Sequence, residues 1–416
     1  PKLQIHTLSV MQNKQDMKHK ILISIYFFTV VFLNQGYSQT DSINIDTLDF
    51  CKEGNDYYNS YQFDKALNSL SLCYKNDVKN IDCLKKIAQC NYKLGRLKES
   101  KNNYLKILGY DSVNILAKNQ LGVIYANESK YNKSIKQYEK LIVLDSTNSF
   151  YYKRIGQIFL MLENIDMSIK YLEKAHSINP KDISVIADLS NNYQKVNLLT
   201  EAESLIRKGI NLDSSNVKVL ITHSKIAYKQ TNYDIVINTI NQVLKIQKDT
   251  SLYMMKFLGI SHFLLKDYQK SIFFMEMFTE QNQDLDYVYY YLGLAHRAIG
   301  DFENSVFYFE KAIEVGISNN ISIYYTSLAI TYEENENYKE SIQAYQEAYR
   351  SSKNKILLYH LARNYEAYYS DKATALLYYE KYLAMNDSNN IEFKEYSKYK
   401  ISELKETIHF KLDTLE

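Results

Sequence analysis

One motif recurs along this chain at a spacing close to 34 residues. Residues 301–316 read DFENSVFYFEKAIEVG and residues 164–179 read NIDMSIKYLEKAHSIN, with apolar, small and charged residues in the same order. The residue in the middle of the motif, here named the anchor, recurs at Ala66, Ser100, Ser134, Ser168, Ala202, Val236, Ser271, Ser305, Ser341 and Ala375. Successive anchors are 34 residues apart, except for one step of 35 and one of 36. Such a period indicates stacked copies of one supersecondary unit.

The pattern around each anchor predicts two helices per unit. A bulky residue stands four positions after every anchor, and apolar residues recur at i, i+3, i+4 and i+7 on both sides of a short polar stretch. A second small residue precedes the anchors by 12 or 13 positions, at Gly54, Ala88, Gly122, Gly156, Ser190, Ser224, Gly259, Gly293, Ala329 and Ala362. Small residues on both helices allow close approach, and only the next hairpin can cover the remaining apolar face.

The composition agrees with a chain that is helical nearly throughout. Its 416 residues include 2 prolines and 11 glycines, 46% of them are apolar, and no Pro-, Gly- or Ser-rich linker divides the repeats. The 40 tyrosines are scattered at helical spacing, which favours a packing role over aggregation. The fold class that we predict is therefore all-α.

A 34-residue helix-turn-helix unit with small residues at its eighth, twentieth and twenty-seventh places resembles the tetratricopeptide repeat family. In the clearest copy, residues 149–182, the family's favoured places hold Gly156, Phe159, Ser168, Ala175 and Pro180. The sequence departs from the family in preferring Ser at the anchor and in losing the closing Pro in nine copies. The resemblance covers about residues 47–388 and implies an α-solenoid of about ten antiparallel repeats that forms a right-handed superhelix.

Both ends of the chain differ from the repeats. Residues 389–416 predict a C-terminal capping helix, and its buried stripe is expected to hold Ile391, Tyr396, Tyr399, Leu404 and Ile408. Residues 39–46 are polar and predict a loose linker.

The first 38 residues predict a secretory signal peptide. A basic cluster at residues 18–20 precedes thirteen mostly apolar residues, 21–33, and Gly36 and Ser38 fit the small residues before a cleavage site. The start is expected near Met17, with residues 1–16 as upstream sequence. A retained membrane anchor is the alternative, but thirteen residues fall short of the ~20 that span a bilayer. We therefore expect an exported bacterial protein that is periplasmic or extracellular and not inserted in the membrane after cleavage.

The charge balance argues against some classes of partner. Cleavage after residue 38 removes four lysines and one aspartate from 50 basic and 48 acidic side chains, which leaves a net charge of −1. A nucleic-acid binder needs a basic excess to displace counterions, and this chain has none. Binding to anionic membranes is disfavoured for the same reason.

Sequence motifs of catalysis are missing. The chain contains no phosphate-binding glycine loop, nucleophile elbow or HExxH motif, so we expect no enzyme activity, cofactor or metal. His262 and His296 stand 34 residues apart at equivalent places. Packing is the favoured interpretation, because other copies carry Tyr or Phe there and a metal needs more than two ligands; a metal site or a pH switch is the alternative.

Four cysteines, Cys51, Cys73, Cys83 and Cys90, fall in the first two repeats. An exported protein meets oxidising conditions, and Cys73 and Cys83 bracket a turn, so a disulfide between them is one expectation. Four buried small hydrophobic residues are the other.

The family resemblance also implies a binding groove. The first helix of each repeat would line it with places 2, 5, 9 and 12 of the unit, and its end would be acidic. The candidates are Lys85, Tyr92, Asn119, Lys153, Gln157, Lys225, Tyr228, Lys256, Tyr290, Arg297, Glu333, Arg363 and Glu366. A plain solvated helix face is the alternative.

These observations favour a non-catalytic interaction scaffold that binds a protein segment in the groove. A sensory or regulatory repeat module, whose output domain lies outside this chain, is the alternative. The sequence does not identify the partner or the oligomeric state.

Overall fold

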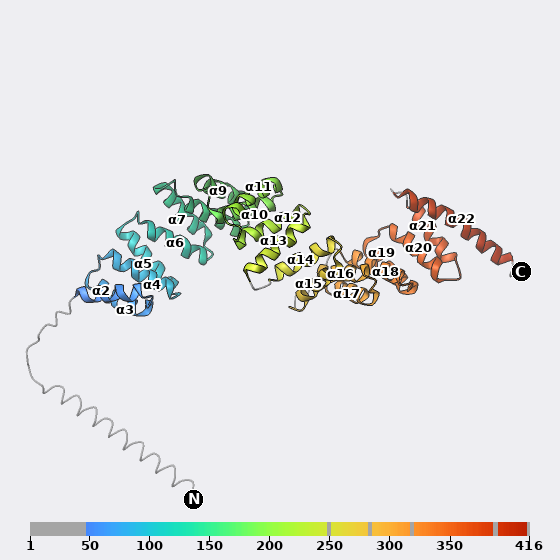
Figure 1. Cartoon of the computed structure of the whole chain (residues 1–416), viewed down its shortest axis with the longest axis horizontal. Helices are drawn as coiled ribbons and strands as arrows, with labels where there is room; N and C mark the ends of the chain where they lie inside the picture. The colour runs from blue at the N-terminus through green and yellow to red at the C-terminus, as the bar shows by residue number, and fades with distance from the viewer. Residues whose placement is uncertain (1–46, 248–250, 282–284, 317–319, 386–389, 414–416) are drawn as a thin grey trace, which may run out of the picture. The chain divides into compact units, whose positions relative to one another are not determined.

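The computed structural model describes residues 47–247, 251–281, 285–316, 320–385 and 390–413 (Figure 1). The predicted signal peptide and the linker at residues 39–46 lie outside the described residues. Every regular element in the described part is a helix, as the sequence predicts. The helices are α2 (Thr47–Asn59), α3 (Phe63–Asn76), α4 (Ile81–Lys93), α5 (Leu97–Tyr110), α6 (Ile115–Asn127), α7 (Tyr131–Leu144), α8 (Ser149–Met161), α9 (Ile165–Ile178), α10 (Ile183–Lys195), α11 (Leu199–Leu212), α12 (Val217–Lys229), α13 (Tyr233–Ile246), α14 (Leu252–Leu264), α15 (Tyr268–Thr279), α16 (Asp286–Ala298), α17 (Phe302–Val315), α18 (Ile321–Glu334), α19 (Tyr338–Ser352), α20 (Ile356–Tyr368), α21 (Ala373–Ala384) and α22 (Ile391–Asp413).

The described residues divide into two compact units, unit 1 up to residue 124 and unit 2 from residue 125 onward, with the boundary inside α6. Unit 1 contains the hairpins α2–α3 and α4–α5. In unit 2 the hairpins follow one another from α8–α9 to α20–α21, and α22 packs against α21 (Figure 1). Within each unit the second helix of a hairpin also packs against the first helix of the next. This stacking builds the core expected of an all-α repeat protein.

Close contact at the small residues joins the two helices of a hairpin. A Cβ added to Gly156 would lie 2.8 Å from Cγ of Leu172, the bulky residue four positions after the anchor Ser168. The Ser168 hydroxyl donates a hydrogen bond of 2.8 Å to the Gly156 carbonyl oxygen. The same bond, from an anchor serine to the carbonyl oxygen 12 residues earlier, forms in the pairs Ser100 and Ala88, Ser305 and Gly293, and Ser341 and Ala329. These bonds explain why the anchor is so often Ser.

The turn inside nine of the hairpins uses left-handed backbone; the turn between α20 and α21 does not. A residue with positive φ stands five positions before the anchor at Tyr61, Gly95, Ser129, Glu163, Asn197, Thr231, Lys266, Gly300 and Glu336. Only two of these are glycine, although left-handed backbone costs other residues roughly 1–2 kcal/mol. The regular spacing shows that hairpin packing fixes this backbone conformation.

The turn between hairpins uses a pair of side-chain caps. Asp145 Oδ1 accepts a 3.0 Å hydrogen bond from the Thr147 N–H, and the Asn148 side chain accepts one of 3.2 Å from the Phe150 N–H. Two hydrogen bonds from Thr147 lower the pKa of Asp145; the bond from the hydroxyl has the larger effect and the bond from the backbone N–H the smaller. Cap pairs recur at Asp77 and Asn80, Asp111 and Asn114, Asn179 and Asp182, and Asp213 and Asn216. They end one helix and start the next both in the copy that keeps the closing proline, Pro180, and in copies that lack it.

Helix α22 buries a different stripe from the one expected. Leu404 is buried as expected, but Ile391 is 74% exposed and Tyr399 is 64% exposed. Phe393 and Ile401 contact the preceding core instead. With the buried Ser397, these positions advance along the helix by four, four and three residues, which places Ile391 and Tyr399 on the opposite side of the helix.

The expected disulfide between Cys73 and Cys83 is wrong. Cys73 of α3 is bonded to Cys51 of α2, with Cα atoms 5.0 Å apart. Cys51 and Cys73 can meet because they lie on the two facing helices of one hairpin. The Cys83 thiol instead donates a hydrogen bond of 3.0 Å to the Leu70 carbonyl oxygen. Cys83 and Cys90 are buried free thiols, and burial raises the pKa of each to about 11. Such thiols are poor nucleophiles at neutral pH.

We expect Gly293→Ala to destabilise the protein. The added Cβ would lie 2.8 Å from two ring carbons of Phe309, which is fully buried and has no room to move. Overpacking of this kind costs about 1–3 kcal/mol. Urea unfolding followed by circular dichroism measures the loss.

Gly109→Ala is the matched control. Gly109 lies in α5, and a Cβ added there meets nothing within 4 Å. Replacing a helical glycine by alanine without a clash should raise stability by about 0.5–1 kcal/mol. Destabilisation of similar size by both substitutions would contradict the close contact inferred at Gly293.

Candidate functional site

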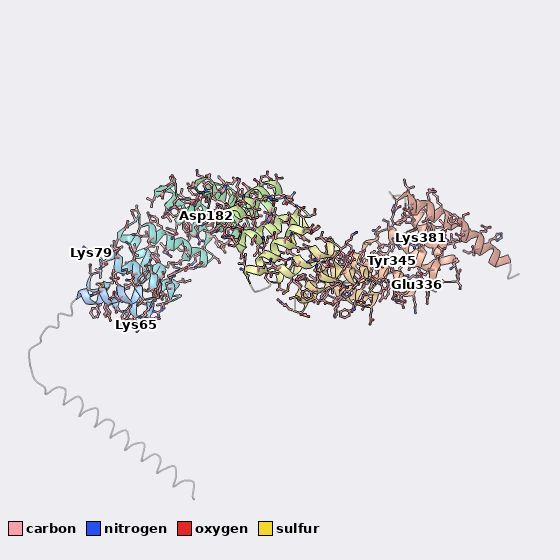
Figure 2. All side chains as sticks on the ribbon, in the orientation of Figure 1. Lys65, Lys79, Asp182, Glu336, Tyr345 and Lys381 are labelled. Atoms are coloured by element: carbon pink, nitrogen blue, oxygen red, sulfur yellow. A yellow bond between two sulfur atoms is a disulfide. The ribbon has the colours of Figure 1, made fainter. Side chains whose placement is uncertain are left out.

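The first helices of the unit 2 hairpins carry side chains that reach from one first helix to the next. We name the helices α8, α10, α12, α14, α16, α18 and α20 the first-helix row. Ten of the thirteen groove candidates lie on it, and all but the exposed Arg363 are half-buried. Figure 2 labels Asp182, at the start of α10, and Tyr345, in α19 beside the row.

Ion pairs and amides link the first part of the row. Lys153 on α8 lies 2.8 Å from the carboxylate of Asp182, and Gln157 donates a 3.0 Å hydrogen bond to Asp188 on α10. Asp188 also lies 2.6 Å from the ammonium of Lys218 on α12. Burial acts against ionisation of Asp182, but bonds from Lys153 and from backbone N–H groups leave its pKa lowered. The basic candidate Lys153 is thus neutralised by its neighbour.

Aromatic rings occupy the middle of the row. The ammonium of Lys225 on α12 lies 5.3 Å from the ring centre of Tyr253 on α14. The Phe257 ring lies 4.4 Å from that of Tyr253 and 4.7 Å from that of Tyr228. Lys256 lies 5.1 Å from the same Phe257 ring. Lysine side chains over rings are held by cation–π attraction, so both ammonium groups have defined positions.

The aromatic stretch continues onto α16 and α18. Lys256 also lies 5.7 Å from the ring centre of Tyr287 on α16. The candidate Tyr290 packs 5.1 Å from Tyr324 of α18. Burial raises the pKa of Tyr228 and of Tyr253 to about 12, so these phenols are neutral at physiological pH.

Acidic side chains at the end of the row are already paired. Glu333 on α18 lies 3.5 Å from Arg363 on α20, and Glu366 on α20 lies 2.8 Å from Lys400 on α22. Arg297 donates a 3.2 Å hydrogen bond to the Ser327 carbonyl oxygen. The acidic end expected from the sequence is therefore neutralised by Arg363 and Lys400.

These two carboxylates also reach the core. The hydroxyls of Tyr345 and Tyr379, which stand four positions after their anchors, donate 2.9 Å hydrogen bonds to Glu333 and Glu366. Burial and then the neighbouring carboxylate raise the pKa of each tyrosine. Glu333 thus connects a buried second-helix side chain to the first helix of the next repeat, and Glu366 connects another to α22.

The other three candidates belong to unit 1. Lys85 pairs with Asp82 of its own helix at 2.9 Å, and Tyr92 is half-buried on α4. The Asn119 side-chain oxygen is buried and unbonded among the atoms that the structure describes. Lys86, which the sequence analysis did not select, donates a hydrogen bond to Asn55 of α2.

Several partners on the row were missed by sequence reasoning. Tyr253 and Tyr287 stand at place 2 of their units, a place already assigned to the groove, so the repeat register could have found them. Asp182 and Asp188 lie outside the four groove places. Their roles depend on how far each helix is turned toward its neighbour, which the register alone does not give.

His262 and His296 are buried, and their rings stack on Phe274 and Tyr308 with centres 5.7 and 5.2 Å apart. His262 Nδ1 lies 3.2 Å from the carboxylate of Asp267, and His296 Nδ1 lies 2.9 Å from that of Asp301. Each histidine thus contacts the residue just before the second helix of its own hairpin. No group of three or more His, Cys, Asp or Glu side chains within the described ranges is arranged to hold a metal ion.

No helix within the described ranges has both the length and the apolar character that a bilayer span requires.

Comparison with known proteins identifies the repeat. The family model described as Tetratricopeptide repeat matches residues 116–148, 151–182, 287–315 and 323–355. None of the curated proteins compared matches the chain.

Three solved structures illustrate the similarity. MamA is 20% identical over 41% of this chain and 94% of its own, with a TM-score of 0.38. Pseudomonas aeruginosa pilF is 17% identical over 51% of this chain and 96% of its own, with a TM-score of 0.44. YrrB, titled a TPR protein with an unusual peptide-binding site, is 17% identical over 43% of this chain and 93% of its own, with a TM-score of 0.37.

We expect stability to fall as the pH is lowered through about 6.5. Burial is the first cause of a lowered pKa at His176, His223, His262 and His360, from an ordinary value of 6.5. Above pH 6.5 these histidines are mostly neutral in both the folded and the unfolded chain. Below it the unfolded chain binds more protons than the folded one, so the free energy of unfolding decreases. Each contributes a slope of at most ~1.4 kcal/mol per pH unit. Thermal unfolding between pH 7.5 and 5 measures the combined effect.

His360→Phe should reduce this pH dependence. The ring of His360 stacks on Tyr345 at 5.3 Å, and phenylalanine keeps that contact without a titrating group. A profile unaltered by His360→Phe would exclude burial of this histidine as a cause of acid sensitivity.

Proposed function

Because this chain is a tetratricopeptide repeat protein, we propose that it is a non-catalytic scaffold that binds an extended segment of another protein along its first-helix row. The observation that carries the proposal is the set of contacts between neighbouring first helices. Lys153 contacts Asp182, Lys225 contacts Tyr253, and Glu333 contacts Arg363; of these six side chains all but the exposed Arg363 are half-buried. A surface arranged in advance loses less entropy when it binds.

The residue types on the row also support binding of a protein segment. Tyr and Arg are enriched among residues that dominate binding energy at protein interfaces. Tyr228, Tyr253, Tyr287 and Tyr290 form a nearly continuous aromatic stretch from α12 to α16. Each has only two side-chain torsions, so its immobilisation costs little.

We place this scaffold in the cell envelope or the secreted space. The apolar stretch at residues 21–33, with its basic flank, supports export. The Cys51–Cys73 disulfide supports it independently, because such bonds persist in oxidising compartments and are rare in the cytosol. The disulfide ties α2 to α3 in the first described hairpin.

Cysteine mapping tests the location. Protein alkylated before lysis and isolated from the envelope fraction should yield a peptide pair joined by Cys51 and Cys73. Cys83 and Cys90 should react only after denaturation, because both are buried. Recovery of Cys51 and Cys73 as free thiols from the native compartment would contradict export to an oxidising space. A Cys73–Cys83 peptide would contradict the hairpin geometry.

Site-specific crosslinking tests the binding surface. Benzoylphenylalanine in place of Tyr287 lies on the first-helix row, and the same group in place of Phe307 lies on the second helix α17, where Phe307 is 50% exposed. Irradiation in cells should give discrete high-mass adducts from position 287 and none from position 307. Adducts from position 307 alone would move the binding surface to the second helices.

A further inference from the structure

Lys195 of α10, Lys225 of α12 and Lys256 of α14 differ from four other basic residues of the row. Lys153, Lys218, Arg297 and Arg363 each lie within 4.0 Å of a carboxylate oxygen, as does Lys400 of α22. Lys195, Lys225 and Lys256 have no carboxylate oxygen within 4.0 Å among the residues that the structure describes. Within the described residues, no carboxylate therefore balances the positive charge of these three lysines.

Lys225 shows the physical consequence most clearly. It is half-buried on α12, and burial followed by repulsion from Lys195 lowers its pKa. A cation removed from water is normally paired, because lost hydration must be replaced by an opposite charge. Here the neighbouring groups are the Tyr253 ring and another lysine. A bound anion would supply the missing charge.

The surroundings of the lysines are aromatic. Tyr228, Tyr253, Phe257 and Tyr287 form the surface against which the ammonium groups of Lys225 and Lys256 lie. A ligand at this site would therefore meet two positive charges and several apolar ring faces together. An acidic side chain alone would use only part of that surface.

We propose that the stretch from α12 to α16 binds an acidic segment of a partner protein, in which carboxylate side chains alternate with apolar or aromatic ones. The carboxylates pair with Lys225 and Lys256, and the apolar side chains pack on the Tyr and Phe rings. This inference rests on the proposed function and specifies the chemistry of the occupant.

The ring contacts constrain the segment. The Tyr253 ring lies 5.3 Å from the Lys225 ammonium and 4.4 Å from the Phe257 ring, which lies 5.1 Å from the Lys256 ammonium. The two ammonium groups are therefore no more than about 15 Å apart, and an extended chain that rises about 3.3 Å per residue covers that distance when its carboxylates stand up to about four residues apart.

Local charge favours a protein segment over a nucleic acid or a membrane. Polyanions bind through many phosphate contacts, which require a broad basic field. Here three lysines are flanked on one side by the neutral cluster of Lys153, Asp182, Asp188 and Lys218, and on the other by Arg297 near Glu334. A site limited to a few positive charges fits a few carboxylates.

A peptide panel tests the proposal. The probe is a short fluorescein-labelled peptide built from repeats of glutamate, phenylalanine and serine. Its two matched forms replace glutamate by glutamine or phenylalanine by serine. Fluorescence anisotropy with the full chain should show binding of the parent peptide at least about tenfold tighter than either form, because each lost charged pair or ring contact removes about that factor. Equal binding of all three peptides would overturn the proposal.

Paired variants of the protein locate the site. Lys225→Gln with Lys256→Gln should weaken the parent peptide at least about tenfold and make binding insensitive to the change from glutamate to glutamine. The control, Lys170→Gln with Lys245→Gln, removes the same charge from the second helices α9 and α13 and should keep wild-type affinity. Unfolding curves for both variants confirm that each remains folded. Equal affinity of the two variants would overturn the site.

Two further experiments distinguish this proposal from the proposed scaffold function. A single-stranded oligonucleotide and phosphatidylserine vesicles should bind no tighter than the peptide with glutamine in place of glutamate. Tighter binding of either that depends on Lys225 and Lys256 would show that the ligand is a nucleic acid or a membrane and would overturn the acidic protein segment. Crosslinking from position 287 that persists unchanged in the Lys225→Gln, Lys256→Gln background would reject the acidic segment and leave the scaffold. Crosslinking from position 307 alone would reject both.

Discussion

The close contact between the two helices of each hairpin is the constraint on which the rest of the structure depends. Gly156 and Gly293 leave no room for a methyl group beside Leu172 and Phe309, and an anchor serine bonds to the carbonyl oxygen of the glycine. This contact fixes how each first helix is rotated. One side of the first helix then faces the second helix of the same hairpin. Only the side chains on its other side can reach the next repeat.

That rotation produces the first-helix row. Tyr345 shows the connection, because its ring is buried in the core and its hydroxyl bonds to Glu333. Glu333 in turn reaches Arg363 on the next first helix. Core packing thus sets the position of a charged group on the surface, and the same arrangement recurs with Tyr379, Glu366 and Lys400.

Sequence reasoning predicts what the repeat period controls. The anchors, the bulky residues after them and the helical hairpins are local and periodic, so the helices could be assigned from spacing alone. The disulfide partner of Cys73 could not be assigned from spacing. Cys83 lies near Cys73 across a turn, but Cys51 faces Cys73 from the other helix of the same hairpin, and the bond forms with Cys51. The buried stripe of α22 was also missed at Ile391, since no repeat register extends into that helix. Pairing along the row depends on helix rotation, which spacing does not encode.

The unpaired lysines can be weighed against the rest of the row. The chain places carboxylates beside Lys153, Lys218 and Arg363, so the fold can accommodate a neutralising partner. Beside Lys225 and Lys256 it places Tyr253 and Tyr287 instead, and the rings hold the ammonium groups without cancelling their charge. Departures from local consistency of this kind are expected at functional sites. A ligand that brings its own carboxylates supplies the opposite charge. The rings meanwhile provide the apolar contact that makes binding selective for a segment of mixed character.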